Sequence, residues 1–198
     1  GNSFGFKSVI VMPKTQSEEK KNELRTYGAE LTLVPAVPYS NPKNYVRYSE
    51  TLSKKIKKKN KNKSVLWANQ FDNLANFQAH YETTGPEIWK DTKGKIDGFI
   101  CSVGTGGTIA GTGSFLKKKN KKIKIGLVDP MGSALHNYYA NGELKSSGNS
   151  ITEGIGQSRI TENLKKAEID ESFQANDTDA LKIVFDLLKE EGLIMGGS

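Results

Sequence analysis

A glycine- and threonine-rich stretch, VGTGGTIAGTG at residues 103–113, is the part of the sequence best suited to binding a ligand. It follows the apolar run IDGFICS and precedes SFLKKK, an order that indicates a strand, a loop and a helix. Glycines let a main chain approach a ligand closely, and the N–H groups at the start of a helix bind anions. The stretch therefore predicts either an anion-binding loop or a purely structural turn.

Two nucleotide-binding patterns fail on this stretch. A dinucleotide fingerprint, G-x-G-x-x-G, starting at Gly104 requires a glycine where the chain has Ile109. A Walker loop starting at Gly106 finds its second glycine at Gly111, but it then requires a lysine where the chain has Thr112. The loop therefore lacks the residues that bind a dinucleotide or a nucleoside triphosphate.

The remaining interpretation is a loop that binds a single phosphate monoester. Backbone N–H groups at the start of the helix would bind its oxygens, and Thr105 and Thr108 would add hydroxyl donors. No lysine or arginine lies within the loop, which favours a docked cofactor phosphate over a phosphate that is transferred. A structural glycine turn stays open as the alternative.

Expected strands and helices alternate along the chain around this loop. Apolar runs predict strands at residues 7–13, 30–35, 64–69, 96–103 and 122–130, and helical patterns occupy residues 14–30, 43–59, 73–85, 86–94, 106–120 and 177–192. Such alternation predicts an α/β fold with mostly parallel, twisted sheets covered by helices.

Two of these helices carry end signals. Thr15 and Glu18 have the spacing of a capping box, and Gly28 ends the first helical pattern. Asp177 is the expected N-cap of the last helix, which Gly192 ends.

The composition changes near NQFDN at residues 69–73, which is the best candidate for a domain boundary. We expect a smaller domain over residues 1–72 and a larger one over residues 73–198. Residues 131–159 are rich in Gly, Ser and Asn with little periodicity, and loops of that length are usually functional.

Charge and hydropathy narrow the classes of partner. Lysine plus arginine outnumber aspartate plus glutamate by 29 to 22, with lysine runs at residues 54–63 and 117–122. A nucleic-acid patch is one interpretation, but no aromatic residue is interleaved to stack on bases. Both runs end an expected helix, where the helix dipole favours lysine. We therefore expect no nucleic-acid partner. We also expect no membrane span, because no apolar run approaches the length of about 18 residues that a membrane-spanning helix requires.

Neither the cysteine nor the histidines form a catalytic or metal-binding pattern. Cys101 is the single cysteine, which excludes an intrachain disulfide and fits a reducing, cytoplasmic setting. We expect it to be a buried strand residue, and a reactive thiol is the alternative. His80 and His136 lie far apart without a neighbouring cysteine or paired carboxylate, so packing or surface roles are expected. No metal-ligand spacing is present.

Five motifs in order resemble the cysteine synthase (O-acetylserine sulfhydrylase) family, within the β-family or fold type II of pyridoxal-phosphate enzymes. They are NQFDN, TTGPEIW, VGTGGTIAG, SITEGIGQ and EEGLIMGGS, and the stretches VMPKTQSEEKKNELRTYGAEL and VPAVPYSNPKNYV are similar too. The resemblance spans essentially the whole chain. It implies that residues 1–72 are the remainder of the smaller, substrate-gripping domain and that residues 73–198 belong to the larger, cofactor-binding domain.

The resemblance also implies roles for particular residues. The loop would bind the phosphate of pyridoxal 5'-phosphate, Ser198 would hydrogen-bond the pyridine nitrogen, and Gln70 would help bind the substrate carboxylate. The phosphate-binding residues would be Gly104, Thr105, Gly106, Gly107 and Thr108, and the pocket wall would be Gly154, Ile155 and Gly156.

The family's Schiff-base lysine and its substrate-binding asparagine loop have no match in this sequence. No catalytic residue is therefore assigned, and we expect a fragment that lacks an N-terminal part and a C-terminal end. Such a fragment would by itself bind the cofactor poorly and be inactive.

For the intact protein the resemblance implies replacement of the acetoxy group of O-acetylserine by sulfide, giving cysteine and acetate. It also implies a homodimer and a possible complex with serine acetyltransferase. Two alternatives stay open: an enzyme of the cystathionine β-synthase type, which uses serine and homocysteine, and a catalytically silent relative with a binding or sensing role.

Overall fold

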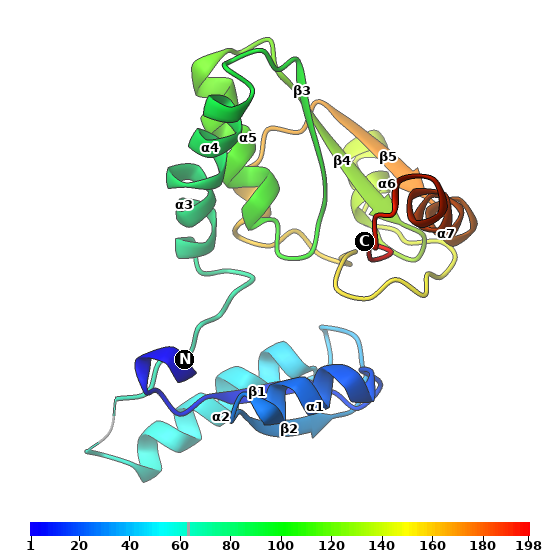
Figure 1. The fold of residues 1–198 in the computed structure, drawn as a ribbon. Helices are drawn as coiled ribbons and strands as arrows, with labels where there is room; N and C mark the ends of the chain where they lie inside the picture. Colours follow the sequence, from blue (N-terminus) through cyan, green and yellow to red (C-terminus); the bar gives the residue numbers. More distant parts are fainter. Residues whose placement is uncertain (63) are drawn as a thin grey trace. The chain divides into compact units, whose positions relative to one another are not determined.

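The chain folds into two compact units in the computed structural model, which describes residues 1–62 and 64–198 (Figure 1). Unit 1 comprises Gly1–Asn69 and unit 2 comprises Gln70–Ser198. The boundary predicted from the sequence followed residue 72, which lies in the turn that opens unit 2. Helices alternate with parallel strands in both units, so the chain has an α/β fold, as predicted.

Unit 1 is built on a two-stranded parallel sheet with a helix in the connection between its strands. Val9 lies opposite Glu30 at the start of the pairing. The elements in chain order are η1 (Asn2–Phe4), β1 (Val9–Pro13), α1 (Glu18–Thr26), β2 (Glu30–Val34) and α2 (Tyr45–Lys59). Both strands and the helices α1 and α2 lie within the predicted ranges, but α1 is much shorter than the predicted helix over residues 14–30.

The capping box predicted for α1 is wrong. The helix begins at Glu18, so its N-cap is Ser17, whose Oγ accepts a hydrogen bond from Lys20 N at 3.4 Å. Thr15 lies outside the helix, and the Glu18 carboxylate pairs with Lys21 instead of binding back to a cap. Serine caps as well as threonine does, so the local sequence allowed both starts.

The strand predicted over residues 64–69 does not form. Leu66 is 89% exposed, and the indole N–H of Trp67 donates to Ser49 Oγ of α2 at 3.1 Å. The largest side chain of this run is thus held by a helix, and the run forms no regular element.

Both lysine runs lie at the C-terminal ends of helices, as the sequence predicts. Exposed lysines form the last turn of α2, and lysines also end α5 (Gly107–Lys119). Residue 63, which ends the first run, lies outside the described residues. The positions of these lysines complement the partial negative charge of a helix C-terminus.

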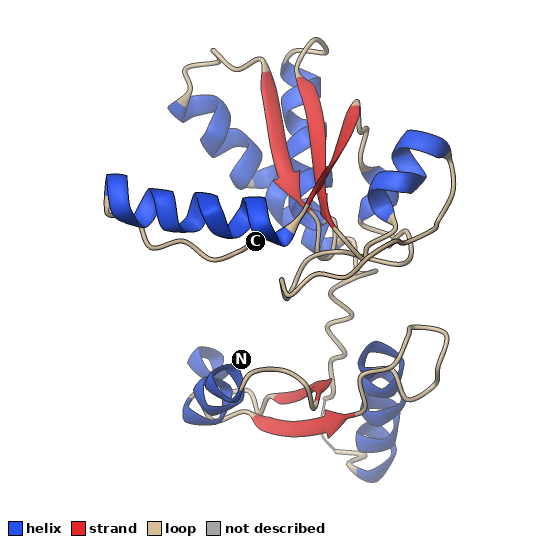
Figure 2. Cartoon of the chain, turned by 90° about the vertical axis from the view of Figure 1, so that its right-hand side faces the viewer, coloured by secondary structure: helices blue, strands red, loops and turns tan. Residues whose placement is uncertain are grey.

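Unit 2 contains a three-stranded parallel sheet in the order β3-β4-β5 (Figure 2). Its strands are β3 (Gly98–Ser102), β4 (Lys124–Pro130) and β5 (Glu171–Ala175). Its helices are α3 (Ala75–Glu82), α4 (Thr84–Asp91), α5, α6 (Leu135–Asn141) and α7 (Asp177–Asp186), with short turns η2 (Leu164–Lys166) and η3 (Leu187–Glu191). Because the strands are parallel, their carboxyl ends lie at one edge of the sheet.

Two elements of unit 2 were not predicted. The sequence of β5, ESFQA, has no clear apolar alternation, and the strand forms because it pairs with β4, with Gly126 opposite Glu171. Residues 131–159 were expected to be irregular, yet they contain α6. This helix begins where the carboxylate of Asp129 accepts a hydrogen bond from His136 N at 2.8 Å.

The predicted N-cap of α7 is also wrong. Asn176 caps the helix, because its Oδ1 accepts a hydrogen bond from Asp179 N at 2.9 Å. The carboxylate of Asp177 instead accepts hydrogen bonds from Ser150 Oγ at 2.6 Å and Ile151 N at 2.9 Å. Asp177 therefore fixes the long irregular segment to the start of α7.

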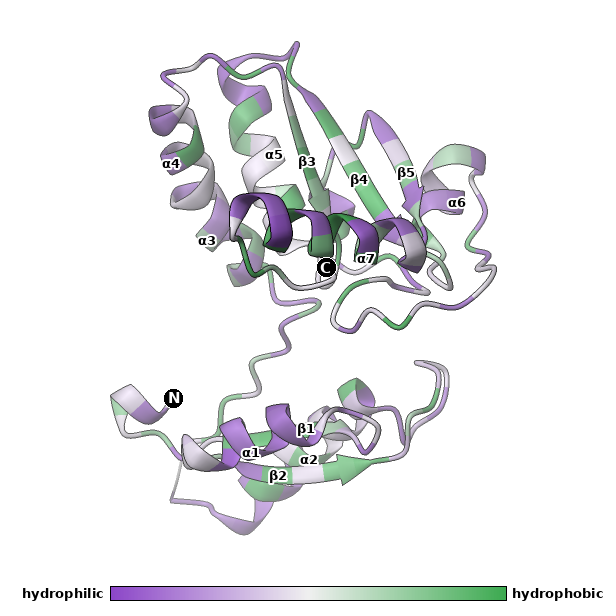
Figure 3. Cartoon of the chain, turned by 45° about the vertical axis from the view of Figure 1, so that its right-hand side comes forward, coloured by the Kyte–Doolittle hydropathy of each residue, from purple (hydrophilic) through white to green (hydrophobic). Residues whose placement is uncertain are grey.

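The main hydrophobic core lies between α5 and one face of the three-stranded sheet. Figure 3 shows hydrophobic residues along both β3 and β4. The buried members of the core are Val103, Ile109, Leu116, Ile123, Ile125, Leu127, Leu135 and Leu164. On the opposite face, Ile100 and Phe173 remain 62% and 44% exposed.

Helix α3 packs against α5 with close contact between backbones. A Cβ atom added at Gly111 would lie 2.3 Å from the Phe77 carbonyl oxygen and 2.7 Å from His80 Cβ. Only glycine allows the two helices to approach so closely. The start of α5, which follows the glycine loop, is thereby held against α3.

We expect Gly111→Ala to destabilise the protein although alanine favours helix formation by about 1 kcal/mol over glycine. The overpacking cost of about 1–3 kcal/mol exceeds that gain, since the obstacle is a backbone oxygen. Urea unfolding of the wild type and the variant measures the difference. Gly196→Ala, where an added Cβ would have no atom within 4 Å, is the control. A Gly111→Ala variant as stable as the control variant would contradict this packing.

Candidate functional site

The glycine loop joins the carboxyl end of β3 to the N-terminus of α5. Gly106, the N-cap, has a φ of 87°, and a Cβ atom there would lie 2.7 Å from Leu164 Cβ. Ala110 N donates to Gly106 O at 3.1 Å, as the first hydrogen bond of the helix. The earlier N–H groups of the turn lie outside this ladder, as an anion-binding site requires.

The segment predicted to form the pocket wall lies directly beside the loop. Gly156 N donates to Val103 O at 2.8 Å, and a Cβ atom added at Gly104 would lie 2.5 Å from Gly154 O. Ile155 lies between these contacts and is half-buried. The structure therefore brings residues 154–156 and the loop together from segments far apart in the sequence.

Ser198, predicted to bind the pyridine nitrogen, also lies at this edge of the sheet. Its carbonyl oxygen accepts a hydrogen bond from Ser102 Oγ, at the end of β3, over 3.3 Å. Its own side chain is exposed.

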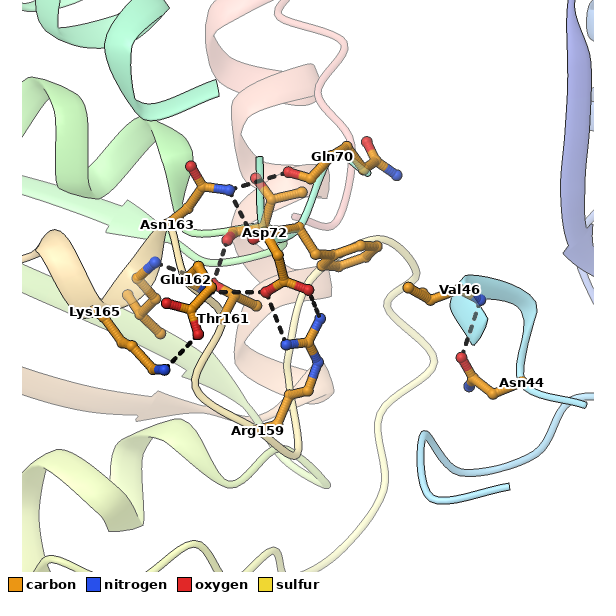
Figure 4. A network of polar contacts seen from close by, with 12 residues as sticks. Asn44, Val46, Gln70, Asp72, Arg159, Thr161, Glu162, Asn163 and Lys165 are labelled. Carbon is orange, nitrogen blue, oxygen red and sulfur yellow. Dashed lines mark hydrogen bonds and ion pairs between the residues drawn. The ribbon is translucent and has the colours of Figure 1, made fainter. Parts of the chain in front are cut away.

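Gln70 is connected to the loop through its main chain. Its carbonyl oxygen accepts hydrogen bonds from the side-chain amides of Asn76 at 2.8 Å and Asn163 at 3.2 Å. Gln70 is exposed, and its side-chain amide points away from Asn163 (Figure 4). Hydrogen bonds thus fix the main chain of Gln70, whereas its side chain, which is predicted to bind the substrate carboxylate, is exposed.

Sequence reasoning missed two buried polar residues, one that binds the loop and one that binds the start of unit 2. Thr161 Oγ1 donates to Thr105 O at 2.7 Å and accepts from Leu164 N at 3.0 Å. Asn163 accepts from Phe77 N at 3.1 Å and donates to the Phe71 carbonyl oxygen at 2.7 Å. They lie in TENL, a polar run that reads as a solvated loop, so only its contacts identify it as buried.

An ion pair joins the start of unit 2 to the same segment. Arg159 donates two hydrogen bonds of 2.9 Å to the Asp72 carboxylate, which also accepts one from Glu162 N at 3.0 Å (Figure 4). The guanidinium lies 5.9 Å from the centre of the Phe71 ring. Burial raises the pKa of Asp72, but the hydrogen bonds from Arg159 and Glu162 and the charge of Arg159 outweigh it, so the pKa lies below its ordinary value.

The two histidines have different surroundings. His80, expected to have a packing or surface role, contacts a loop residue: its Nε2 lies 3.2 Å from Thr108 Oγ1, and its Nδ1 lies 2.9 Å from Thr84 Oγ1. His136 packs elsewhere, with its Nδ1 3.1 Å from Ser172 Oγ. His80 is therefore a neighbour of the candidate site, and sequence spacing gave no sign of it.

Two other titratable groups lie near the core, the half-buried Cys101 and the buried Asp129. Cys101 lies in β3 and packs against the core, and burial raises the pKa of its thiol. Burial likewise raises the pKa of Asp129. Among the described residues no group of three or more His, Cys, Asp or Glu side chains could hold a metal ion. In the same part of the chain, no helix is long and apolar enough to cross a membrane.

Comparison with known proteins finds a matching family and several similar proteins. The profile of the family described as pyridoxal-phosphate dependent enzyme matches residues 1–198. Cysteine synthase 1 of Neurospora crassa is 47% identical, over 99% of this chain and 52% of its own length. Cystathionine beta-synthase of Apis mellifera is 36% identical, over 98% of this chain and 37% of its own length. The chain thus spans about half the length, or less, of these curated relatives.

A solved structure shares the fold. The crystal structure of a hydrogen sulfide-producing enzyme from Fusobacterium nucleatum matches with a TM-score of 0.78 and 32% sequence identity. The match covers 99% of this chain and 62% of the other chain.

We expect Arg159→Met to lower the free energy of unfolding by about 1–3 kcal/mol near neutral pH, because it removes the two charged hydrogen bonds to the Asp72 carboxylate and leaves that of Glu162 N. The lowered pKa of Asp72 supplies stability that is present above its ordinary pKa of 3.8 and is lost as the pH falls through the lowered value. The difference between wild type and variant should therefore shrink below pH 3.8.

Urea unfolding at a series of pH values measures this difference. Lys54→Met, which removes an exposed ion pair with Glu50, is the control and should cost less than about 0.5 kcal/mol. A deficit in the Arg159→Met variant that stays constant down to acid pH would exclude the ion pair as its cause.

Proposed function

The chain belongs to the family of pyridoxal-phosphate dependent enzymes, and we propose that it forms part of a cysteine synthase. This enzyme would replace the acetoxy group of O-acetyl-L-serine by sulfide, giving L-cysteine and acetate. The observation that carries the proposal is the glycine loop at the carboxyl end of β3, with the 154–156 segment beside it. The 47% identity to a protein named cysteine synthase 1 supports the choice of reaction.

The residues around the loop fit the cofactor's phosphate. The N–H groups of the first turn of α5 and the hydroxyls of Thr105 and Thr108 would donate to its oxygens. The turn contains no lysine or arginine, which favours a docked cofactor phosphate over a phosphate that is transferred. We assign the phosphate to Gly104, Thr105, Gly106, Gly107 and Thr108.

Other residues would orient the cofactor ring and the substrate. Ser198 would offer a neutral hydroxyl to the pyridine nitrogen, Gln70 would donate its amide to the substrate carboxylate, and Gly154, Ile155 and Gly156 would line the pocket. When bound, pyridoxal phosphate supplies the electron sink that allows the α-proton and the acetoxy group to leave. The lysine that would carry the cofactor has no match in these 198 residues.

The organisation of the intact protein follows from the same resemblance. We propose that unit 1 belongs to the substrate-gripping domain and unit 2 to the cofactor-binding domain, with the boundary before Gln70 and not after residue 72 as the sequence predicted. We also propose a cytoplasmic homodimer of fold type II that can form a complex with serine acetyltransferase. The 62% coverage of the Fusobacterium nucleatum structure supports an architecture larger than this chain.

The test uses the whole protein. After purification it should show the visible absorbance of bound pyridoxal phosphate, O-acetylserine should shift that absorbance, and sulfide should restore it as cysteine forms. Formation of cystathionine from serine and homocysteine, in place of cysteine, would favour the cystathionine β-synthase alternative. A folded protein without cofactor absorbance would overturn the proposal.

We expect Gly106→Val to weaken retention of pyridoxal phosphate by about tenfold or more, which corresponds to about 1.4 kcal/mol. The valine would be strained at a φ of 87°, and its Cβ would meet Leu164, so the turn that presents the N–H groups would shift. Equilibrium dialysis of the cofactor measures the change.

Gly142→Val is the matched control. Gly142 ends α6 with a φ of 80°, and an added Cβ there has no atom within 4 Å. It therefore carries the same backbone strain away from the loop, and cofactor retention should be unchanged. Equal retention by both variants would show that the glycine loop is only a turn.

A further inference from the structure

Asn76, in the first turn of α3, links two segments that the proposed function treats separately. Its Nδ2 donates to the Gln70 carbonyl oxygen and to Thr105 Oγ1, each at 2.8 Å. The first partner belongs to the segment assigned to the substrate, and the second belongs to the loop assigned to the cofactor phosphate. One half-buried side chain therefore contacts both.

The contact with Gln70 determines how the Asn76 amide is oriented. A main-chain carbonyl can only accept hydrogen bonds, so the group that faces it must be the NH₂ and not the amide oxygen. The same NH₂ faces Thr105 Oγ1, and the Thr105 hydroxyl must therefore act as the acceptor in that contact.

Thr105 Oγ1 accepts a second hydrogen bond from Gly107 N at 3.3 Å. A hydroxyl oxygen has two lone pairs and one proton, so both lone pairs are now engaged. In the described part of the chain the hydroxyl proton has no acceptor. The Thr105 side chain is thus left as a pure donor, which is the role that an anion beside the loop requires.

Tight packing keeps Asn76 in this position. A Cβ atom added at Gly107 would lie 2.1 Å from Asn76 Oδ1, so the amide rests against the Gly107 backbone. The main chain of the loop has a separate anchor, because Thr161 Oγ1 donates to Thr105 O at 2.7 Å. Removing the Asn76 amide should therefore change the Thr105 hydroxyl without releasing the loop.

We propose that Asn76 is a positioning residue that holds the Thr105 hydroxyl as a donor toward the phosphate group and fixes the Gln70 carbonyl with the same amide. The proposal rests on the proposed function, since it assumes a phosphate at the loop. It makes the position of the substrate-binding segment depend on the residue that orients a phosphate donor.

The test compares the binding of pyridoxal 5'-phosphate with that of pyridoxal, which lacks the phosphate, to the whole protein freed of cofactor. Asn76→Ala should weaken pyridoxal 5'-phosphate binding by about tenfold, the effect of one hydrogen bond to a charged group, and leave pyridoxal binding unchanged. Unchanged pyridoxal binding also shows that the variant is folded. Asn141→Ala, at the exposed C-terminal end of α6, is the control and should affect neither ligand.

Variants of Thr105 test whether Asn76 acts through that hydroxyl. Thr105→Val should show the same selective loss, Thr105→Ser should retain affinity, and the double variant Asn76→Ala/Thr105→Val should bind no more weakly than Thr105→Val alone. Asn76→Asp keeps the side-chain volume but cannot donate, so it should show the selective loss as well. It serves as the second variant if Asn76→Ala does not fold.

The outcomes separate the two proposals. A wild-type protein that does not bind pyridoxal 5'-phosphate would refute the proposed function. A wild type that binds it, with Asn76 variants that bind it equally well or lose both ligands alike, would refute the role of Asn76 alone. Additive losses in the double variant would show that Asn76 does not act through Thr105.

Discussion

A loop that binds an anion with its own N–H groups cannot also use those groups to hold itself in place. The glycine loop meets this constraint by having its oxygen atoms bound from outside. Gly156 N binds the Val103 carbonyl, Thr161 Oγ1 binds the Thr105 carbonyl, and the Asn76 amide binds the Thr105 hydroxyl. Apart from Gly107 N, which donates to Thr105 Oγ1, the N–H groups at the start of α5 precede the helix's own hydrogen-bond ladder and are available to the proposed phosphate. Other segments of unit 2 thus supply the donors that bind the oxygen atoms of the loop.

The anchors explain why a long irregular segment is stable. Between β4 and β5 the chain contains only α6 and η2 as regular elements, yet its polar groups are paired along the way. Ser133 Oγ accepts from Gln157 N at 2.8 Å and donates to its carbonyl at 3.0 Å, and Asp177 binds residues 150 and 151. Each contact satisfies backbone groups that would otherwise be unpaired, so the segment acts as a fixed wall for the loop.

Patterns local in sequence predicted the glycine loop, β3, α5 and β4, because apolar runs and glycines determine these elements over a few residues. Elements that depend on distant partners were missed. ESFQA becomes β5 through pairing with β4, whereas SVLWAN forms no strand and Trp67 binds α2. The site residues named from the resemblance lie around one edge of the sheet. Thr161 and Asn163 could not be found from the sequence, because the residue type alone does not show whether a polar side chain is buried or exposed to solvent. The observed helix starts also differ from the predicted ones where two nearby residues are equally good N-caps. Ser17 caps α1 in place of Thr15, and Asn176 caps α7 in place of Asp177.

The first residues of unit 2 have a consequence for preparing this unit as a separate protein. A recombinant form that starts at residue 73 would remove the carbonyl groups of Gln70 and Phe71, the only acceptors of the buried Asn163 amide among the described residues, and would leave Arg159 without the Asp72 carboxylate. An unsatisfied buried amide costs about 1–3 kcal/mol, a large share of the stability of a small domain. These residues, although they lie in a turn outside any helix or strand, are structural parts of the larger unit, and a cut must be made before Gln70.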